Sequence, residues 1–144
     1  MQITLSFEGY WSEAYKSGVP AQSGVYCVYS CIHNKEQKTG IIKKLLYIGE
    51  SENARERIAN HDRLDDWLKI VPIGQTLCYS FAPVNSIDRE RAEAALIFKT
   101  QPSYNTEHKK EFIYNDTKII TNGKNTFLPT VFLLSEGKII INNC

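Results

Sequence analysis

Two apolar runs separated by a short polar segment constrain the fold of this chain most. Residues 24–32, GVYCVYSCI, and residues 41–49, IIKKLLYIG, are rich in the β-branched and aromatic residues that favour strands. Residues 33–40, HNKEQKTG, lie between them and have the polar composition of a hairpin loop. The pattern predicts two antiparallel strands that lie next to each other in a sheet.

Helical periodicity and turn residues predict the other elements. Apolar residues recur at helical spacing over residues 52–70, so we expect an amphipathic helix there with Ser51 as its N-cap. A second helix, over residues 87–100 with Ser86 as its cap, is expected to be largely buried because it is rich in alanine. The remaining expected elements are a strand over residues 2–7, a short helix over 11–17, and strands over 76–84, 118–121 and 126–134.

The C-terminal segment, residues 107–144, is predicted to form a β extension. Residues 109–117 are expected to be irregular, whereas Ser135–Lys138 has turn character between the apolar runs 132–134 and 139–141. We expect these two runs to form a hairpin. Because so apolar an edge needs cover, a second copy of the chain or another protein is expected to dock on it.

These elements predict an α+β fold with a small central antiparallel sheet flanked by helices and an appended C-terminal β-hairpin. No linker rich in Pro, Gly or Ser interrupts the chain, so residues 1–144 are expected to form a single domain. Its core would span residues 22–106 and its β extension residues 107–144. A chain of 144 residues can bury a sizeable core without disulfides or structural metals.

The composition of the chain excludes several classes of protein. With 42% hydrophobic and 23% charged residues it is globular, and no apolar run approaches the ~20 residues of a membrane span. Residues 1–5, MQITL, lack the basic start of a signal peptide, so we expect a soluble cytoplasmic protein with no membrane partner. A net charge of +1 disfavours a protein that coats DNA, but it permits an enzyme that contacts a few phosphates in one cleft.

The cysteines are expected to be reduced. Cys27 and Cys31 fall on one face of a predicted strand, and with Cys78 they are expected to be small core residues. A zinc site that adds His33 is the less favoured alternative, since the spacing is not CxxC. Cys144 is expected to be an exposed terminal thiol.

Four polar residues in the first half of the chain are candidates for chemistry. Tyr26 and Tyr47 lie on the two paired strands and can point to the same face of the sheet. His61 follows Arg57 by four residues, so both are expected to project from one face of the helix over residues 52–70. Each residue alone has an ordinary role, in core packing for a tyrosine and at the surface for an arginine or a histidine.

A carboxylate and an amide follow on the second predicted helix and just after it. Glu93 lies among alanines, and a buried carboxylate needs an ion-pair partner or a metal ion because an unpaired buried charge is unfavourable. Asn105 follows Pro102 in the loop that leaves the helix, where a side-chain amide can hold geometry. The two residues are therefore candidates to complete a site with the four above.

Taken in order, the six residues resemble the signature of the GIY-YIG nuclease family. That family has two tripeptides on adjacent strands, and this chain has GVY at 24–26 and YIG at 47–49. An arginine eight residues after the second tripeptide, a histidine four residues later, a downstream glutamate and an asparagine in PSYN complete the set. The resemblance covers residues 22–106, whereas residues 1–21 and 107–144 lie outside it.

The resemblance implies a metal-dependent endonuclease that hydrolyses phosphodiester bonds in a DNA substrate. Glu93 would bind one Mg²⁺ or Mn²⁺ ion, and Arg57 would pair with the scissile phosphate. Tyr26, or Tyr47, would help to remove the proton of the attacking water, with His61 either supporting that role or acting as a rival base.

Target choice stays open at this point. Glu50 directly follows the second tripeptide, and a carboxylate beside a phosphate site repels the substrate unless it points away. The sequence contains no zinc finger, helix-turn-helix or basic arm that would select a target. The alternative function is a nucleic-acid-binding or partner-docking module that retains this fold without catalysis.

Overall fold

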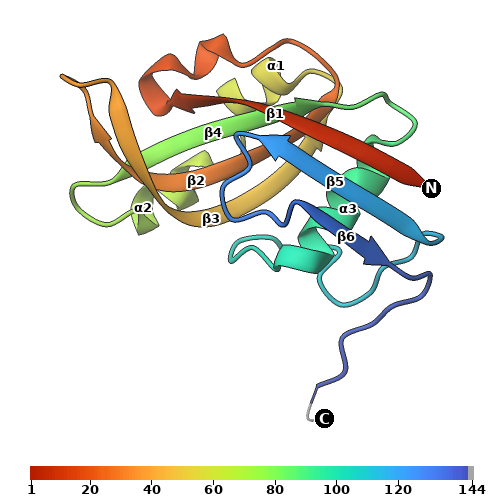
Figure 1. The fold of residues 1–144 in the computed structure, drawn as a ribbon. Helices are drawn as coiled ribbons and strands as arrows, with labels where there is room; N and C mark the ends of the chain where they lie inside the picture. The colour runs from red at the N-terminus through yellow and green to blue at the C-terminus, as the bar shows by residue number, and fades with distance from the viewer. Residues whose placement is uncertain (143–144) are drawn as a thin grey trace.

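The computed structural model describes residues 1–142 and has an α+β fold built on a curled sheet of six strands (Figure 1). The strands are β1 (Gln2–Ser12), β2 (Gly24–Asn34), β3 (Thr39–Ser51), β4 (Thr76–Pro83), β5 (Thr117–Gly123) and β6 (Val131–Leu134). They lie in the order β3–β2–β4–β1–β5–β6 across the sheet. Neighbours are antiparallel except β1 and β5, which are parallel, so the sheet is mixed.

The predicted pair of strands is confirmed as β2 and β3. Their register places Tyr26 opposite Gly49 and Val28 opposite Tyr47, which brings the two tripeptides of the sequence side by side. Both strands are longer than expected, so only residues 35–38 form the loop between them.

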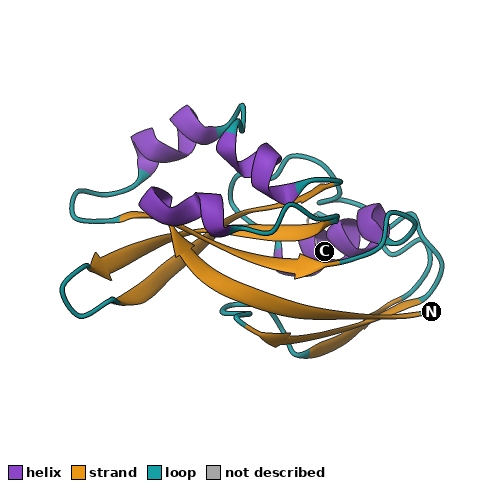
Figure 2. Cartoon of the chain, turned by 90° about the horizontal axis from the view of Figure 1, so that it is seen from above, coloured by secondary structure: helices purple, strands orange, loops and turns teal. Residues whose placement is uncertain are grey.

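Helices cover both faces of the sheet, and three of them gather on one side (Figure 2). On one face, α3 (Arg89–Thr100) contributes apolar side chains to the larger core. On the other face, a second core is closed by α1 (Ala54–Ala59) and α2 (Leu64–Ile70), beside the 3-10 helix η1 (Glu13–Gly18). The sheet therefore separates two cores.

The central strand β2 contributes to both cores. Cys27 and Tyr29 belong to the core with α3, whereas Tyr26 and Val28 belong to the core under α1 and α2. A strand that is covered on both faces has no solvated side, which explains why GVYCVYSCI is apolar nearly throughout.

The prediction of one helix over residues 52–70 is wrong, because the chain breaks between α1 and α2. Asn53, and not Ser51, is the N-cap of α1, since its side-chain oxygen accepts a hydrogen bond from the N–H of Glu56 at 3.1 Å. The side-chain amide of Asn60 donates to the carbonyl oxygen of Glu56, and such local bonds compete with helical ones. The residues that follow Asn60 therefore leave the helix.

Two further helix boundaries differ from the prediction. The expected helix over residues 11–17 begins later, as η1, because the end of β1 pairs with β4 over its first positions. The second long helix begins at Arg89 with Asp88 as its N-cap, rather than at residue 87 with Ser86 as its cap. There the side-chain oxygen of Asn85 accepts the main-chain N–H of Asp88 at 2.8 Å, which satisfies a donor that precedes the helix.

The predicted C-terminal hairpin is also wrong in its pairing. The turn over Ser135–Lys138 is present, but β6 pairs with β5 and not with residues 139–141. After the turn the chain runs along residues 110–112, where Ile139 bridges Glu111. Because β5 lies beside β1, the extension is part of a mixed sheet and is not appended to an antiparallel one. This pairing joins the two ends of the chain, which no local pattern encodes.

Apolar side chains stay exposed along β6 and after it. The strand begins at Val131, later than expected, because residues 125–128 form a turn. Leu133 is 70% exposed and Ile141 is 64% exposed. A partner that covers this edge stays a prediction.

The three cysteines expected in the core are buried free thiols. Cys27, Cys31 and Cys78 belong to the core with α3, which confirms their structural role, whereas Cys144 lies outside the described residues. Across residues 1–142, no three His, Cys, Asp or Glu side chains form a group that could hold a metal ion, so a zinc site with His33 finds no support there. None of the helices in the same range has the length and apolar character needed to cross a membrane.

Candidate active site

A cavity of about 400 Å³ lies where β2 and β3 meet α1, α3 and the loop after α3. Five of the six expected residues line it, and the sixth, His61, reaches it through a hydrogen bond to Tyr26. The expected residues that line the cavity are Tyr26, Tyr47, Arg57, Glu93 and Asn105. The other charged or titratable residues that line it are Glu50, Asp62, Arg63, Glu107 and His108.

Close packing across the β2–β3 pair sets the position of the Tyr26 hydroxyl. Gly49 lies directly opposite Tyr26, and a Cβ atom at Gly49 would overlap the ring and hydroxyl of that tyrosine. Gly49 is therefore required because a side chain would clash with Tyr26, and not because its backbone adopts an unusual φ. The ring of Tyr47 lies on the same face, with its centroid 6.4 Å from that of Tyr26.

His61 occupies the break between α1 and α2, so it does not share a helix face with Arg57 as the spacing predicted. It is only 5% exposed, and its ring packs on Trp67 with centroids 4.4 Å apart. The break thus turns the imidazole inward, toward Tyr26, while Arg57 stays at the end of α1.

The hydrogen bonds of His61 assign the proton to one ring nitrogen. Nδ1 accepts a hydrogen bond from the main-chain N–H of Arg63 at 3.0 Å, so the neutral ring carries its proton on Nε2. Nε2 lies 2.9 Å from the hydroxyl oxygen of Tyr26 and donates to it. The Asp62 carboxylate also lies 3.2 Å from Nδ1, but its side chain is largely exposed to solvent.

Burial keeps His61 neutral. Desolvation and, after it, the nearby Arg57 guanidinium together lower the pKa of His61 to about 4, and Asp62 only partly opposes them. A neutral imidazole with its lone pair already used at Nδ1 cannot take a proton from Tyr26 without a change of tautomer. The geometry therefore favours His61 as a donor to Tyr26 and disfavours the rival role of base.

The two tyrosines differ in how strongly the protein opposes their ionisation. Burial raises the pKa of Tyr26 well above its ordinary value, the neighbouring Tyr47 raises it further, and Arg57 opposes both effects. Burial, followed by Glu93, also raises the pKa of Tyr47. Both phenols are neutral at pH 7. The positive charge of the Arg57 guanidinium favours their ionised forms.

Arg57 is held by an exposed carboxylate. Its Nη2 donates to Oδ1 of Asp62 at 3.1 Å, and the Asp62 side chain is 74% exposed. Exposed ion pairs of this kind are weak, so a phosphate can replace the carboxylate. Beside it, Arg63 donates to the carbonyl oxygen of Tyr104 at 3.1 Å and lies over the ring of Tyr47.

Glu93 is a poorly compensated carboxyl group. Burial and, after it, the nearby carboxylates of Glu50 and Glu107 together raise the pKa of Glu93 to about 8. Its nearest basic group is Nε2 of His108, which lies 3.5 Å from Oε1. The ordinary explanation of a carboxylate locked to an arginine therefore does not apply to Glu93.

A simple phosphate pocket would require the Glu50 carboxylate to point away from the site, but it does not. Glu50 lines the cavity, but its carboxylate also accepts a hydrogen bond from Nε of Arg89, which in turn donates to Ser23 at 2.9 Å. The charge of Glu50 is thereby partly compensated, and the repulsion of a substrate is weaker than its position suggests.

Asn105 holds the loop after α3 against the edge of the sheet. Its side-chain oxygen accepts the N–H of Ile48 at 2.9 Å, and its side-chain nitrogen donates to the carbonyl oxygen of Ile48 at 2.8 Å. Next to it, the N–H of Tyr104 donates to the carbonyl oxygen of Leu46 at 3.0 Å. Asn105 therefore pairs with β3 as a neighbouring strand would, and it positions the cavity wall.

The donor set fits a hard divalent cation held mainly by water. Glu93, Glu50 and Glu107 line one cavity, and a cation there would relieve their mutual repulsion, which adds to the burial that raises the pKa of Glu93. Because no group of three ligating side chains exists within residues 1–142, such an ion would keep much of its hydration shell, as Mg²⁺ commonly does.

Several residues of the cavity were missed by the sequence analysis. Glu107 and His108 lie two and three residues after Asn105, so proximity to the PSYN segment was the one signal that could have drawn attention to them. Asp62 could have been found as the neighbour of His61. Nothing local predicts that His108 turns toward Glu93, since it does so with a left-handed φ of 62°.

No protein-family model matches this chain, and neither a curated protein nor a solved structure matches it. The case for a function therefore rests on the chemistry of the cavity and on the order of the residues that line it.

Proposed function

We propose that this protein is a metal-dependent endonuclease of the GIY-YIG type, which hydrolyses phosphodiester bonds in DNA. One observation carries the proposal: Arg57, Glu93, Tyr26 and Tyr47, which lie far apart in the sequence, line a single cavity of about 400 Å³. An anion-binding group, a hard oxygen ligand and groups that can hold a proton are the parts that phosphodiester hydrolysis needs.

Arg57 is assigned to the phosphate. Its guanidinium exchanges the exposed Asp62 for a phosphate oxygen and stabilises the negative charge that grows in the transition state. Arg63 adds a second positive charge to the same wall. Two cations face four carboxylates around the cavity, so binding here is weak unless a metal ion or contacts elsewhere on the protein contribute.

Tyr26 is assigned to the proton of the attacking water. The phenolate oxygen of Tyr26 receives the proton, and the N–H of His61 and the guanidinium of Arg57 stabilise the phenolate that this requires. A phenol has an ordinary pKa of ~10, and burial raises the pKa of Tyr26 above that value even beside Arg57, so its phenolate is a rare species at pH 7. Tyr47 lies beside it and orients the water.

Glu93, with Glu107 on the same cavity wall, would hold the Mg²⁺ or Mn²⁺ ion. When bound, such an ion acts as a Lewis acid that stabilises the leaving oxygen. The loop held by Asn105 keeps this wall in place.

The test is cleavage of plasmid, single-stranded and branched DNA by the purified protein with Mg²⁺ or Mn²⁺. Arg57→Ala and Glu93→Gln are expected to reduce the rate by about 100-fold or more. Lys69→Ala and Glu136→Gln are the matched controls, because each removes the same charge from an exposed position outside the cavity. Undiminished cleavage by folded Glu93→Gln protein would falsify the assignment of the metal ligand.

The second candidate function is a module that binds nucleic acid or a protein without cutting. The observation in its favour is the acidic lining of the cavity, where Glu50, Asp62, Glu93 and Glu107 outnumber Arg57 and Arg63. Binding of DNA with no cleavage under any divalent metal supports this candidate over the nuclease, whereas metal-dependent cuts that vanish in Arg57→Ala exclude it.

A further inference from the structure

A second and larger cavity lies at the far end of β2 from the candidate active site. Its volume is about 700 Å³, which suits a ligand the size of one or two nucleotides. It is bounded by the β2–β3 hairpin and by the loop over residues 123–128. Tyr26 and His33 lie seven residues apart on β2, so the two cavities are about 23 Å apart at ~3.3 Å per residue.

The charge of this cavity is opposite to that of the candidate active site. Lys38 and Lys124 line it, together with His33, and no carboxylate does. Two smaller hollows of about 270 Å³ each adjoin the edge strand β3 and are both lined by Lys43 and Lys44, again without a carboxylate. We call Lys38, Lys43, Lys44 and Lys124 the lysine band.

The lysine band is uncompensated within the protein. All four side chains are exposed, and across residues 1–142 none of the ion pairs involves any of them. The chain as a whole carries a net charge of only +1, so positive charge is concentrated here while the candidate active site is acidic. A surface of this kind attracts a polyanion.

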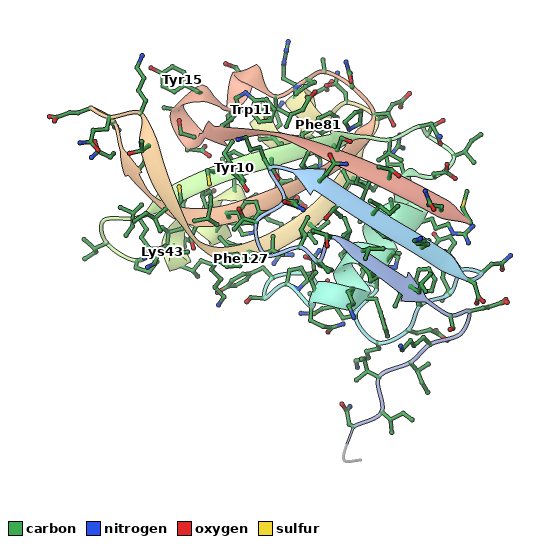
Figure 3. The ribbon with its side chains drawn as sticks, in the orientation of Figure 1. Tyr10, Trp11, Tyr15, Lys43, Phe81 and Phe127 are labelled. Atoms are coloured by element: carbon green, nitrogen blue, oxygen red, sulfur yellow. The ribbon has the colours of Figure 1, made fainter. Side chains whose placement is uncertain are left out.

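An exposed aromatic ring stands within the band. Phe127 lines both the large cavity and one of the smaller hollows, next to Lys43, and Figure 3 labels both residues. Its side chain is 55% exposed, and its φ of 67° lies in the left-handed region, which disfavours a bulky residue. Neither packing nor turn chemistry accounts for a phenylalanine there, and outliers of this kind cluster at functional sites.

The turn that carries Phe127 is fixed to the sheet. The main-chain N–H of Thr126 donates to the hydroxyl of Tyr10 at 3.1 Å, and the hydroxyls of Tyr10 and Thr126 also contact each other. The hydroxyl of Tyr29 donates to the carbonyl oxygen of Thr126 at 2.8 Å. These bonds hold the backbone of the turn in one place, so a ligand that stacks on the Phe127 ring loses little conformational entropy to ordering the turn.

The ordinary explanation of lysines on an edge strand covers only part of the band. Charged residues on an edge prevent unwanted pairing with other strands, and this suffices for Lys43 and Lys44. It does not explain Lys124 or Phe127, which come from the 123–128 loop and not from the edge.

We propose that the lysine band binds a single-stranded segment of DNA, with phosphates on the lysines and a base stacked on Phe127. Exposed aromatic rings between basic groups are what single-strand binding requires, and a paired base could not reach the ring. The proposal rests on the proposed nuclease function for its choice of DNA. At ~3.4 Å per nucleotide, the rise of a stacked B-form strand, about seven nucleotides span the distance between the band and the candidate active site, and an extended unpaired strand needs fewer. The band thus holds an unpaired flank of the substrate and offsets the weak binding in the acidic cavity.

The test is fluorescence anisotropy with a labelled thymidine oligonucleotide in EDTA, so that cleavage does not interfere. Phe127→Asn is expected to weaken binding at least about fivefold without lowering the melting temperature, because asparagine tolerates a positive φ. Lys43→Gln and Lys124→Gln are expected to weaken binding and to reduce the slope of log affinity against log salt by about 0.7 each. Lys69→Gln, which removes a lysine outside the band, is expected to leave both unchanged.

Equal binding by the wild type and Phe127→Asn, an equal loss in Lys69→Gln, or tighter binding of duplex than of single strands would overturn the proposal. Phe127 and the four lysines of the band do not line the candidate active site, so the loss of binding in the band variants is separate from the outcome of the cleavage test. If Phe127→Asn loses single-strand binding and the wild type does not cleave DNA, binding by the lysine band is supported and the nuclease function is refuted. Cleavage of substrates with unpaired flanks that is unchanged in all band variants refutes the band and leaves the nuclease intact.

Discussion

Nε2 of His61 donates a hydrogen bond to the hydroxyl oxygen of Tyr26, 2.9 Å away, because Nδ1 of the same ring already accepts the main-chain N–H of Arg63. The histidine therefore supports negative charge on the tyrosine and does not compete with it for a proton. A break between two helices, and not the spacing within one helix, creates this relationship.

The protonation state of His61 gives the first prediction. Because the pKa of His61 is lowered from 6.5 to about 4, the unfolded chain binds a proton between these values and the folded protein does not. Stability is expected to fall by up to about 3 kcal/mol as the pH drops from 6.5 to 4. Urea unfolding checks this, and His61→Gln is expected to reduce the pH dependence. Long-range ¹⁵N NMR that finds the proton on Nδ1 at pH 7 contradicts the assigned tautomer.

The second prediction concerns Glu93, whose pKa is raised to about 8. Between pH 4.5 and 8 the unfolded chain releases this proton while the folded protein retains it, so metal-free protein loses stability as the pH rises. Glu93→Gln is expected to gain on the order of 3 kcal/mol relative to the wild type at pH 8.5 compared with pH 4.5. Glu136→Gln, from an exposed position that does not contribute to the pKa shift of Glu93, should not gain. Mg²⁺ or Mn²⁺ should stabilise the wild type and not Glu93→Gln.

Gly49 provides a steric test of the position of Tyr26. A methyl group at residue 49 would overlap the Tyr26 ring, so Gly49→Ala is expected to destabilise the protein by about 1–3 kcal/mol and to abolish any cleavage. In a Tyr26→Ala background the same substitution should have little effect on stability, since the ring is gone. An additive double-mutant cycle, measured by denaturant unfolding, contradicts the proposed contact.

Asn105 is expected to matter for stability as well as for activity. Asn105→Ala leaves the N–H and the carbonyl oxygen of Ile48 without their partners, at a cost of about 1–3 kcal/mol. Asn122→Ala, at an exposed position, is the control and should change stability by less than about 0.5 kcal/mol. Equal melting temperatures for Asn105→Ala and the wild type would show that the amide does not hold the loop.

Substitution of Asp62, unlike substitution of Gly49 or Asn105, is expected to improve a property of the protein, its affinity for DNA. Because its exposed carboxylate occupies the Arg57 guanidinium, Asp62→Ala is expected to strengthen DNA binding in the candidate active site by a few-fold. The measurement is DNA affinity in EDTA at low salt, compared with Asp65→Ala on the exposed face of α2 as the charge-matched control. Weaker binding in Asp62→Ala than in the control would mean that Asp62 positions the arginine and does not compete for it.

The sequence by itself determined the β2–β3 pair, because both strands and their turn are local in the chain and carry a continuous apolar pattern. It also determined that Tyr26 and Tyr47 face one side, since side chains alternate along a strand. It failed where short polar side chains decide a boundary, as at Asn53 and Asn60, because their hydrogen bonds override helical periodicity.

Only the tertiary structure decided how the site works. The parallel pair of β1 and β5 joins the two ends of the chain, and such long-range pairing leaves no periodic trace in either strand. The pKa of Glu93 depends on its burial and on carboxylates from β3 and from the loop after α3. The tautomer of His61 matters for the site only because the fold places its Nε2 against the hydroxyl of Tyr26. Burial and charge act through space, whereas the sequence records only order along the chain.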